Sequence, residues 1–164
     1  MKYIWPPIQL TLFDLFEGPS PKISPVPCSI HTRKDRPSSS CLKRLWLHLH
    51  SEWFPHRHDL DQYQVYWSTR PQLRTLASCC LESKRISVAR ELSYEKYEQW
   101  LEPLLYHEMC HAYLDTTDHS KEFKLIESRH PLIKSFDSWI DSGGWGTAIR
   151  SDRAKRSYKR RQKE

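Results

Sequence analysis

The chain has 164 residues and a mass of 19.7 kDa, enough for one domain with flanking tails. Hydrophobic residues make up 38% of it, below the roughly 45–50% that is usual, so part of the chain is expected outside any core. No apolar run approaches the ~20 residues that cross a bilayer, and the first residues lack the apolar segment of a secretory signal. These features exclude a membrane-spanning or secreted class and predict a cytoplasmic protein.

Positive charge is concentrated at the C-terminus. The chain has 26 Lys and Arg against 20 Asp and Glu, a net charge of +6. Residues 150–164 contain eight basic and two acidic residues, so this basic C-terminal tail carries the whole excess and residues 1–149 are formally neutral. A basic arm on a neutral body predicts an acidic partner, most often nucleic acid. A solvated tail that only improves solubility is the alternative.

The composition changes near residue 40. Residues 17–40 are rich in proline and serine and show no periodicity, which predicts a disordered N-terminal arm over residues 1–40. Beyond it, apolar side chains recur at the spacing of one helix face, and they predict a helix over residues 41–53. These side chains are Leu42, Leu45, Trp46, Leu49 and Trp53. We therefore expect a folded domain over residues 41–149.

The rest of the predicted domain combines short strands with helices. Three stretches have strand character, and the last two are separated by a hairpin-length connection, so an antiparallel three-stranded sheet is the economical prediction. These stretches are residues 63–67, 76–81 and 85–89. Helical segments are predicted at residues 95–100, at 101–114, from Ser120 toward Arg129, and across 132–140. The pair Gly143-Gly144 is expected to end regular structure.

A metal-binding pattern lies on the predicted helix 101–114. His107-Glu108-Met109-Cys110-His111 places two histidines four positions apart on one helix face, so both imidazoles can bind one Zn²⁺. Glu108 is displaced by ~100° around the helix axis, where its carboxylate can reach a water on the metal without binding the metal itself. This placement predicts a general base. A surface helix that carries these residues by chance is the alternative.

A third ligand must come from downstream residues. His119 follows His111 by eight positions, enough for the chain to leave the helix, turn and return over the metal. Glu127, His130 and Asp115 are the alternatives, Glu127 because some zinc peptidases use a helical glutamate. We predict that His119 completes the site with His107 and His111. Three neutral nitrogen ligands leave a fourth position open for water, as in catalytic zinc sites.

The motif and the residues that follow it resemble the SprT-like (Spartan-type) zinc metalloproteases. The family pattern HExxHA followed by HGxxF is similar to residues 107–112 and to His119-Ser120-Lys121-Glu122-Phe123. The predicted strands and the helix 41–53 are similar to the family's strands and first helix, so the resemblance spans about residues 41–130. Ser120 departs from the family's glycine. The basic tail stands where many relatives have a cysteine zinc ribbon.

The resemblance implies a small zincin-like α+β domain. It also implies that His107, His111 and His119 bind Zn²⁺, with Glu108 as the catalytic general base of a metalloendopeptidase. The expected substrate is a protein at DNA or crosslinked to DNA. Two other functions remain open. One is a non-proteolytic, zinc-containing DNA-binding or adaptor module, and the other is a metallohydrolase of a non-protein substrate.

A second short motif lies in the N-terminal arm. Gln9-Leu10-Thr11-Leu12-Phe13 resembles the pentapeptide with which bacterial DNA-repair proteins bind the sliding clamp. An apolar peptide on a disordered arm can bury leucine and phenylalanine side chains in a groove of its partner. We therefore predict the DNA sliding clamp as a partner of Gln9, Leu10, Leu12 and Phe13. Packing of this segment on the domain's own surface is the alternative.

Overall fold

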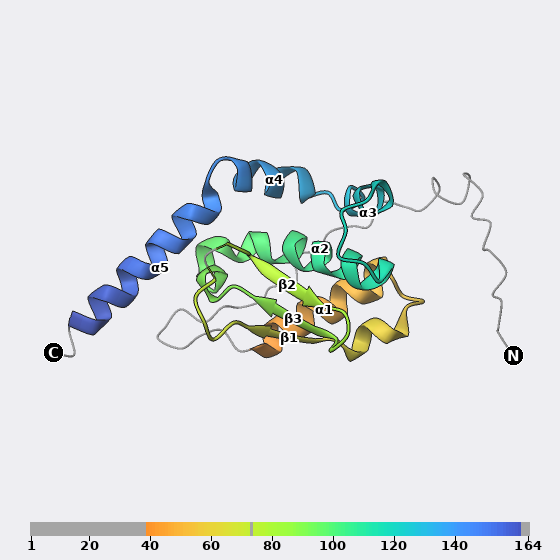
Figure 1. The fold of residues 1–164 in the computed structure, drawn as a ribbon, viewed down its shortest axis with the longest axis horizontal. Coiled ribbons are helices and arrows are strands. Elements are labelled where there is room, and N and C mark those ends of the chain that lie inside the picture. The colour runs from red at the N-terminus through yellow and green to blue at the C-terminus, as the bar shows by residue number, and fades with distance from the viewer. Residues whose placement is uncertain (1–38, 73, 162–164) are drawn as a thin grey trace, which may run out of the picture.

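The computed structural model describes residues 39–72 and 74–161 (Figure 1). The predicted N-terminal arm, including the clamp-like peptide 9–13, lies outside these residues. The described elements comprise helices α1 (Ser39–Trp53), α2 (Leu101–Leu114), α3 (Lys121–Glu127), α4 (Ile133–Asp141) and α5 (Gly144–Arg161), and strands β1 (Gln64–Trp67), β2 (Ala77–Cys80) and β3 (Arg85–Val88). Short 3₁₀ turns η2 (His58–Gln62), η3 (Arg90–Leu92) and η4 (Glu95–Trp100) connect them. The predicted α+β class is confirmed.

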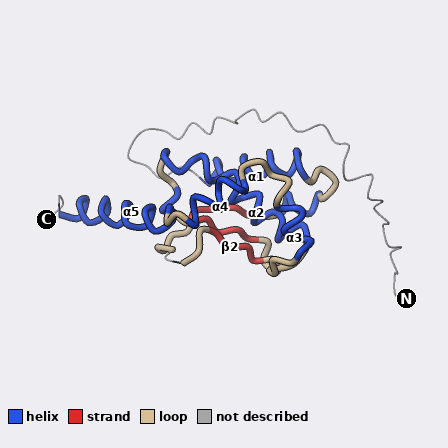
Figure 2. The backbone as a smooth tube through the Cα atoms, turned by 90° about the horizontal axis from the view of Figure 1, so that it is seen from above, coloured by secondary structure: helices blue, strands red, loops and turns tan. Residues whose placement is uncertain are grey.

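Helix α1 forms where the apolar periodicity predicts it. Leu42, Trp46 and Leu49 are almost completely buried, and the indole Nε1 of Trp46 donates a 2.8 Å hydrogen bond to the carbonyl of Leu60. That bond ties the helix to η2, whose last turn also uses the Leu60 carbonyl as the acceptor for the backbone N–H of Tyr63. Helices α1 and α2 lie on one side of the sheet, as Figure 2 shows. The main core fills the space between these two helices and the sheet.

The sheet is mixed, so the prediction of an antiparallel sheet is wrong for one of its two pairings. Its strand order is β1-β3-β2. β2 and β3 form the expected antiparallel hairpin, whereas β1 runs parallel to β3 and does not pair with β2. After β1 the chain crosses to the far edge of the sheet and forms β2 there. The hairpin then places β3 between β1 and β2. β2 is consequently an edge strand.

One face of the sheet is apolar because its side chains alternate along each strand. Val65 and Trp67 of β1 and Ile86 and Val88 of β3 face the core, and the residues between them are more exposed. The central strand is therefore the most deeply buried, and β2 carries its more exposed side chains on the opposite face. The edge strand β2 lies beside helix α2.

Helix α2 has the predicted bounds and is buried around most of its circumference. It ends at Asp115, which takes a left-handed conformation with φ 51°. The chain then turns and starts α3 at Ser120, whose Oγ accepts a 3.2 Å hydrogen bond from the backbone N–H of Phe123. Ser120 thus acts as the helix N-cap at the position where it departs from the family pattern.

The glycine pair does not end regular structure as predicted. Gly143 takes a φ of 81° after α4, and the chain resumes as helix α5 at Gly144. A β-carbon on Gly144 would lie 2.1 Å from the indole Nε1 of Trp139, so the close approach of the two helices requires glycine there. The pair therefore makes a tight turn between two helices.

Helix α5 joins the folded body to the basic tail. Its first turns are anchored, because Ala148 and Asp152 are buried and the Tyr94 hydroxyl donates a 2.8 Å hydrogen bond to the Asp152 carboxylate. Beyond Asp152 the helix projects away from the body, as Figure 1 shows. The predicted boundary between residues 149 and 150 therefore falls inside a continuous helix. Among the helices of the described residues, none is both long and apolar enough to cross a membrane.

Candidate metal centre

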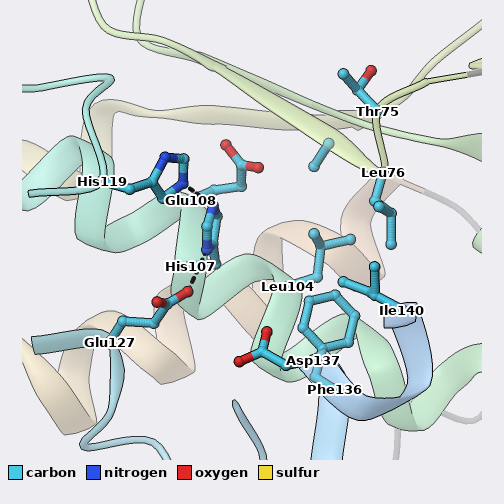
Figure 3. Close-up of a pocket in the computed structure, with 11 residues that line it drawn as sticks. Thr75, Leu76, Leu104, His107, Glu108, His119, Glu127, Phe136, Asp137 and Ile140 are labelled. Carbon is cyan, nitrogen blue, oxygen red and sulfur yellow. Dashed lines mark hydrogen bonds and ion pairs between the residues drawn. The ribbon is translucent and has the colours of Figure 1, made fainter. Parts of the chain in front are cut away.

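Three histidines from two segments converge at the C-terminal half of α2. His107 and His111 project from this helix, and His119 returns from the loop before α3 (Figure 3). The Nε2 atom of His107 lies 3.2 Å from Nε2 of His111 and 3.2 Å from Nε2 of His119. One ring nitrogen of each residue lies within 4.8 Å of the others, so a single metal ion can contact all three.

Hydrogen bonds at the opposite ring nitrogens orient the two helical histidines. Nδ1 of His111 donates to the carbonyl of Thr116 at 2.9 Å, and Nδ1 of His107 donates to the carboxylate of Glu127 at 2.5 Å. Because both acceptors require a proton on Nδ1, each Nε2 carries a bare lone pair when its imidazole is neutral. Two bare lone pairs facing each other at 3.2 Å repel unless a cation lies between them. The residues therefore fit a bound metal ion.

The ring of Phe123 packs against the imidazole rings of all three histidines. Phe123 is completely buried, and its ring centroid lies 4.4–5.1 Å from the centroids of His107, His111 and His119. The first turn of α3 thus supplies both the Ser120 cap and the apolar surface against which the imidazoles pack. This contact fixes the loop that carries His119, because Phe123 lies only four residues beyond it.

Glu108 is buried beside the cluster. Only 5% of the residue is exposed, and burial raises the pKa of its carboxyl to about 7, although nearby His107 partly opposes the rise. His107, Glu108 and His119 line the same cleft, so the carboxyl shares a solvent space with the convergent nitrogens (Figure 3). A carboxyl with a pKa near neutrality can both accept and return a proton at physiological pH.

The histidines have different proton affinities in the metal-free arrangement. Burial and the neighbouring His107 lower the pKa of His111 to about 4, so this imidazole stays neutral and able to bind a metal. Burial lowers the pKa of His107 as well, but its hydrogen bond with Glu127 and the charge of Glu108 outweigh burial and raise it overall. A metal ion at Nε2 of His107 therefore competes with a proton for the same lone pair.

The three residues considered as alternative third ligands either lie outside the histidine cluster or form hydrogen bonds with other groups. His130 is buried against Trp53 and Tyr106, with Nε2 3.2 Å from Glu102 and Nδ1 accepting the backbone N–H of Leu132. The exposed Asp115 ends α2, outside the group of convergent ligands. Glu127 reaches Nδ1 of His107. Sequence reasoning considered Glu127 only as a ligand and missed this contact, for which no local signal exists.

A cleft of about 330 Å³ extends from the histidines along α2. One wall is formed by Thr75, Leu76 and Ala77 at the start of the edge strand β2. The other is formed by Phe136 and neighbouring residues of α4 (Figure 3). The contribution of α4 was also missed, because apolar residues across 132–140 indicate a helix without showing what that helix covers.

The family relationship follows from comparison with known protein families. Residues 42–132 match the SprT-like family, and this segment contains the helix α1, the sheet, the HExxH helix and the returning histidine. The chain belongs to the SprT-like family. Helices α4 and α5 lie beyond the matched segment. No curated protein matches the SprT-like chain significantly.

Two metallopeptidase zymogens are among the solved structures that the SprT-like chain matches. The crystal structure of the metallopeptidase zymogen of Methanocaldococcus jannaschii jannalysin matches with a TM-score of 0.50 and 16% identity, over 70% of this chain and 98% of that chain. The metallopeptidase zymogen of Pyrococcus abyssi abylysin gives a TM-score of 0.45 and 19% identity, over 62% and 93%. The first match shows that the two chains share a small zincin-like α+β fold.

Glu127 gives a test of how the histidines are held. We expect Glu127→Gln to keep a hydrogen-bond acceptor for Nδ1 of His107 but to remove the negative charge, and so to weaken metal binding by about 10–100-fold. Competition with a chromophoric chelator measures this affinity. Glu122→Gln, on the exposed side of the same helix, is the matched control. Unchanged affinity in Glu127→Gln would show that the contact does not support the ligand.

Proposed function

We propose that this SprT-like chain is a zinc-dependent metalloendopeptidase that cleaves proteins at DNA. The observation that carries the proposal is the convergence of three histidine Nε2 atoms beside the buried carboxyl of Glu108. The jannalysin zymogen, which shares the fold, is a metallopeptidase, and this is consistent with the proposed chemistry. His107, His111 and His119 are the proposed ligands, and Glu108 is the proposed catalytic residue.

Zinc is the metal that the donor set favours. A tetrahedral site with Zn–N distances of about 2.0–2.1 Å separates its nitrogen ligands by about 3.3 Å. Two of the nitrogen separations are 3.2 Å, close to that value. Three imidazoles with no thiolate leave a position for water and substrate, which is typical of catalytic and not structural zinc. A structural zinc site needs only its ligands, so it would not require the carboxyl of Glu108 beside the metal.

Each residue has a defined part in hydrolysis. Zinc, when bound, supplies Lewis acidity that polarises the scissile carbonyl and makes water a stronger acid. The Glu108 carboxylate takes a proton from the attacking water as the C–O bond forms, and it delivers this proton to the leaving nitrogen as the C–N bond breaks. Burial of Glu108 keeps its pKa near 7, which matches both transfers. His107 and His111 remain oriented through their Nδ1 hydrogen bonds.

An extended polypeptide is the substrate that the cleft suits best. Among the described residues no strand neighbours β2 on its outer side, and such an edge can pair with an extended peptide. Residues 75–77, which lead into this strand, line the cleft beside Glu108. A peptide paired there would present its backbone carbonyls to the histidine cluster. We therefore propose cleavage within a chain.

Recruitment to DNA is assigned to the C-terminal segment. Residues 150–164 carry the entire net charge of +6, and the exposed side chains of Arg153, Lys155 and Arg161 lie on the projecting part of α5. Such a helix can neutralise phosphates without reading sequence. Binding of a sliding clamp by residues 9–13 remains a proposal based on the peptide alone.

Metal analysis of ligand variants tests the proposed centre. We expect the full chain to bind one zinc ion, and His107→Ala, His111→Ala and His119→Ala each to lose stoichiometric zinc, because each removes one of only three protein ligands. His58→Ala, an exposed histidine in η2, is the matched control. Native mass spectrometry counts the metal. Full zinc in His119→Ala together with loss in His130→Ala would contradict the assignment.

A further inference from the structure

The cleft beside the histidines carries a charge that the proposed chemistry does not use. Glu108, Glu127 and Asp137 are its three carboxyl groups, and no lysine or arginine lines it among the described residues. Glu127 accepts a hydrogen bond from Nδ1 of His107, and Glu108 lies beside the proposed metal ligands. The two positive charges of a divalent metal would balance those two carboxylates. Asp137 is then the carboxylate of this cleft that is left without a counter-charge.

Asp137 stands on α4 with its side chain turned into the cleft. Figure 3 shows its carboxylate on the side of the cleft that carries Glu127. It is exposed and makes no hydrogen bond or ion pair with another described residue. Partial burial and the negative charges of Glu127 and Asp141 raise the pKa of Asp137 above its usual value, although His107 acts in the opposite direction. The carboxylate is therefore in an environment that a cation would stabilise.

Apolar side chains line the cleft beside the metal cluster and Asp137. Leu104 and Phe136 are buried beneath it, and Leu76 and Ile140 form its half-buried sides (Figure 3). An aliphatic chain can lie along such a surface while its charged end remains in contact with water and a carboxylate. Lysine and arginine are the side chains that combine a long apolar stem with a positive end.

We propose that this cleft binds a lysine or arginine side chain of the polypeptide substrate next to the scissile bond, and that Asp137 selects its positive charge. The proposal rests on the proposed peptidase function and names the substrate class of the same site. Asp137 lies outside the residues 42–132 that match the family. The selectivity is accordingly assigned to the α4 wall, outside the matched segment.

Peptides that differ at one residue test the selection. We would use end-blocked peptides containing a single lysine, with norleucine or glutamate replacing it, and locate each cut by mass spectrometry. The wild type should cut next to lysine. In Asp137→Asn the ratio of kcat/KM for lysine over norleucine should fall about tenfold, which is the value expected for one charged hydrogen bond. Asp137→Lys should shift the preference toward the glutamate peptide.

Asp141→Asn is the matched control, because Asp141 is exposed one turn further along α4 and does not line the cleft. An unchanged ratio in Asp137→Asn, or an equal fall in Asp141→Asn, would overturn the proposal. Cleavage that requires a free amino terminus would also overturn it, because the bound cation would then be the α-ammonium group.

A binding measurement separates this proposal from the peptidase function. Zinc-loaded Glu108→Gln should bind the fluorescent lysine peptide more tightly than the norleucine peptide, and the additional substitution Asp137→Asn should abolish the difference. This result would support the charge selection even if the wild type cleaved neither peptide, an outcome that would contradict the peptidase function alone. Equal binding of both peptides would contradict the selection even if both were cleaved.

Discussion

Glu108→Gln is expected to reduce peptide hydrolysis by about 10²–10⁴-fold while zinc content stays at one ion per chain. The amide has nearly the shape of the carboxyl group but cannot accept a proton from water or return one to the leaving nitrogen. Because Glu108 is placed beside the ligands and not among them, the three histidines keep the metal. The measurement is kcat/KM on a fluorogenic peptide, together with metal analysis of the same preparation.

The fold of this variant gives an internal check. Glu108 is buried, so replacing an ionisable group by a neutral amide of the same size should leave Tm unchanged or raise it. Glu122→Gln is a control on an exposed part of α3 and should keep wild-type turnover. Undiminished turnover in Glu108→Gln would contradict the proposed mechanism, and loss of zinc would show that Glu108 is itself a ligand.

The local parts of the site could be predicted from the sequence because local spacing determines them. The i, i+4 spacing of His107 and His111 places both imidazoles on one face of any helix, whatever surrounds it. Ser120 followed by an apolar residue three positions later marks a capped helix start, and the observed bond to Phe123 is that cap. The return of His119 follows from the short loop between two predictable helices.

The parts that could not be predicted depend on contacts between distant segments. Neither β1 nor β3 carries a local signal for their parallel pairing, which depends on the path of residues 68–76. The residue type of Glu127 suits a metal ligand as well as a histidine partner, and only the packing of α3 against α2 distinguishes them. Gly143 and Gly144 are equally suited to ending a helix and to turning between two.

Helix α5 changes how the role of the basic tail must be tested. Asp152 is buried and bonded to Tyr94, so a truncation at residue 149 would remove a group on which the fold depends. Residues 153–164 contain seven basic residues and one acidic residue, and they still carry a net charge of +6. Lys155 lies 3.8 Å from the ring centroid of Tyr94, but its side chain is exposed. Truncation after Asp152 therefore removes the charge and spares the anchored turns.

We expect deletion of residues 153–164 to remove most of the DNA affinity and to leave zinc binding intact, because no proposed ligand lies beyond residue 119. If six or more basic groups contact phosphates, the affinity of the full chain should fall by about 10³-fold or more between 50 and 200 mM salt. The truncated chain should have a much shallower slope, since counterion release scales with the number of neutralised phosphates. Fluorescence anisotropy with a labelled oligonucleotide across a salt series measures both quantities.

A substitution series distinguishes the charge of α5 from its helical shape. Replacing Arg153, Lys155 and Arg161 by glutamine keeps the helix and removes three exposed charges, so the salt slope should decrease by about 3. The matched control replaces three exposed basic residues of the α3 region, namely Lys121, Lys124 and Arg129. If the control lowers the slope equally, or if the truncated and full chains bind with the same slope, the DNA-binding surface belongs to the folded domain. Peptide hydrolysis without DNA should remain near the wild-type rate in the truncated chain, because the described residues that line the cleft all lie before residue 141.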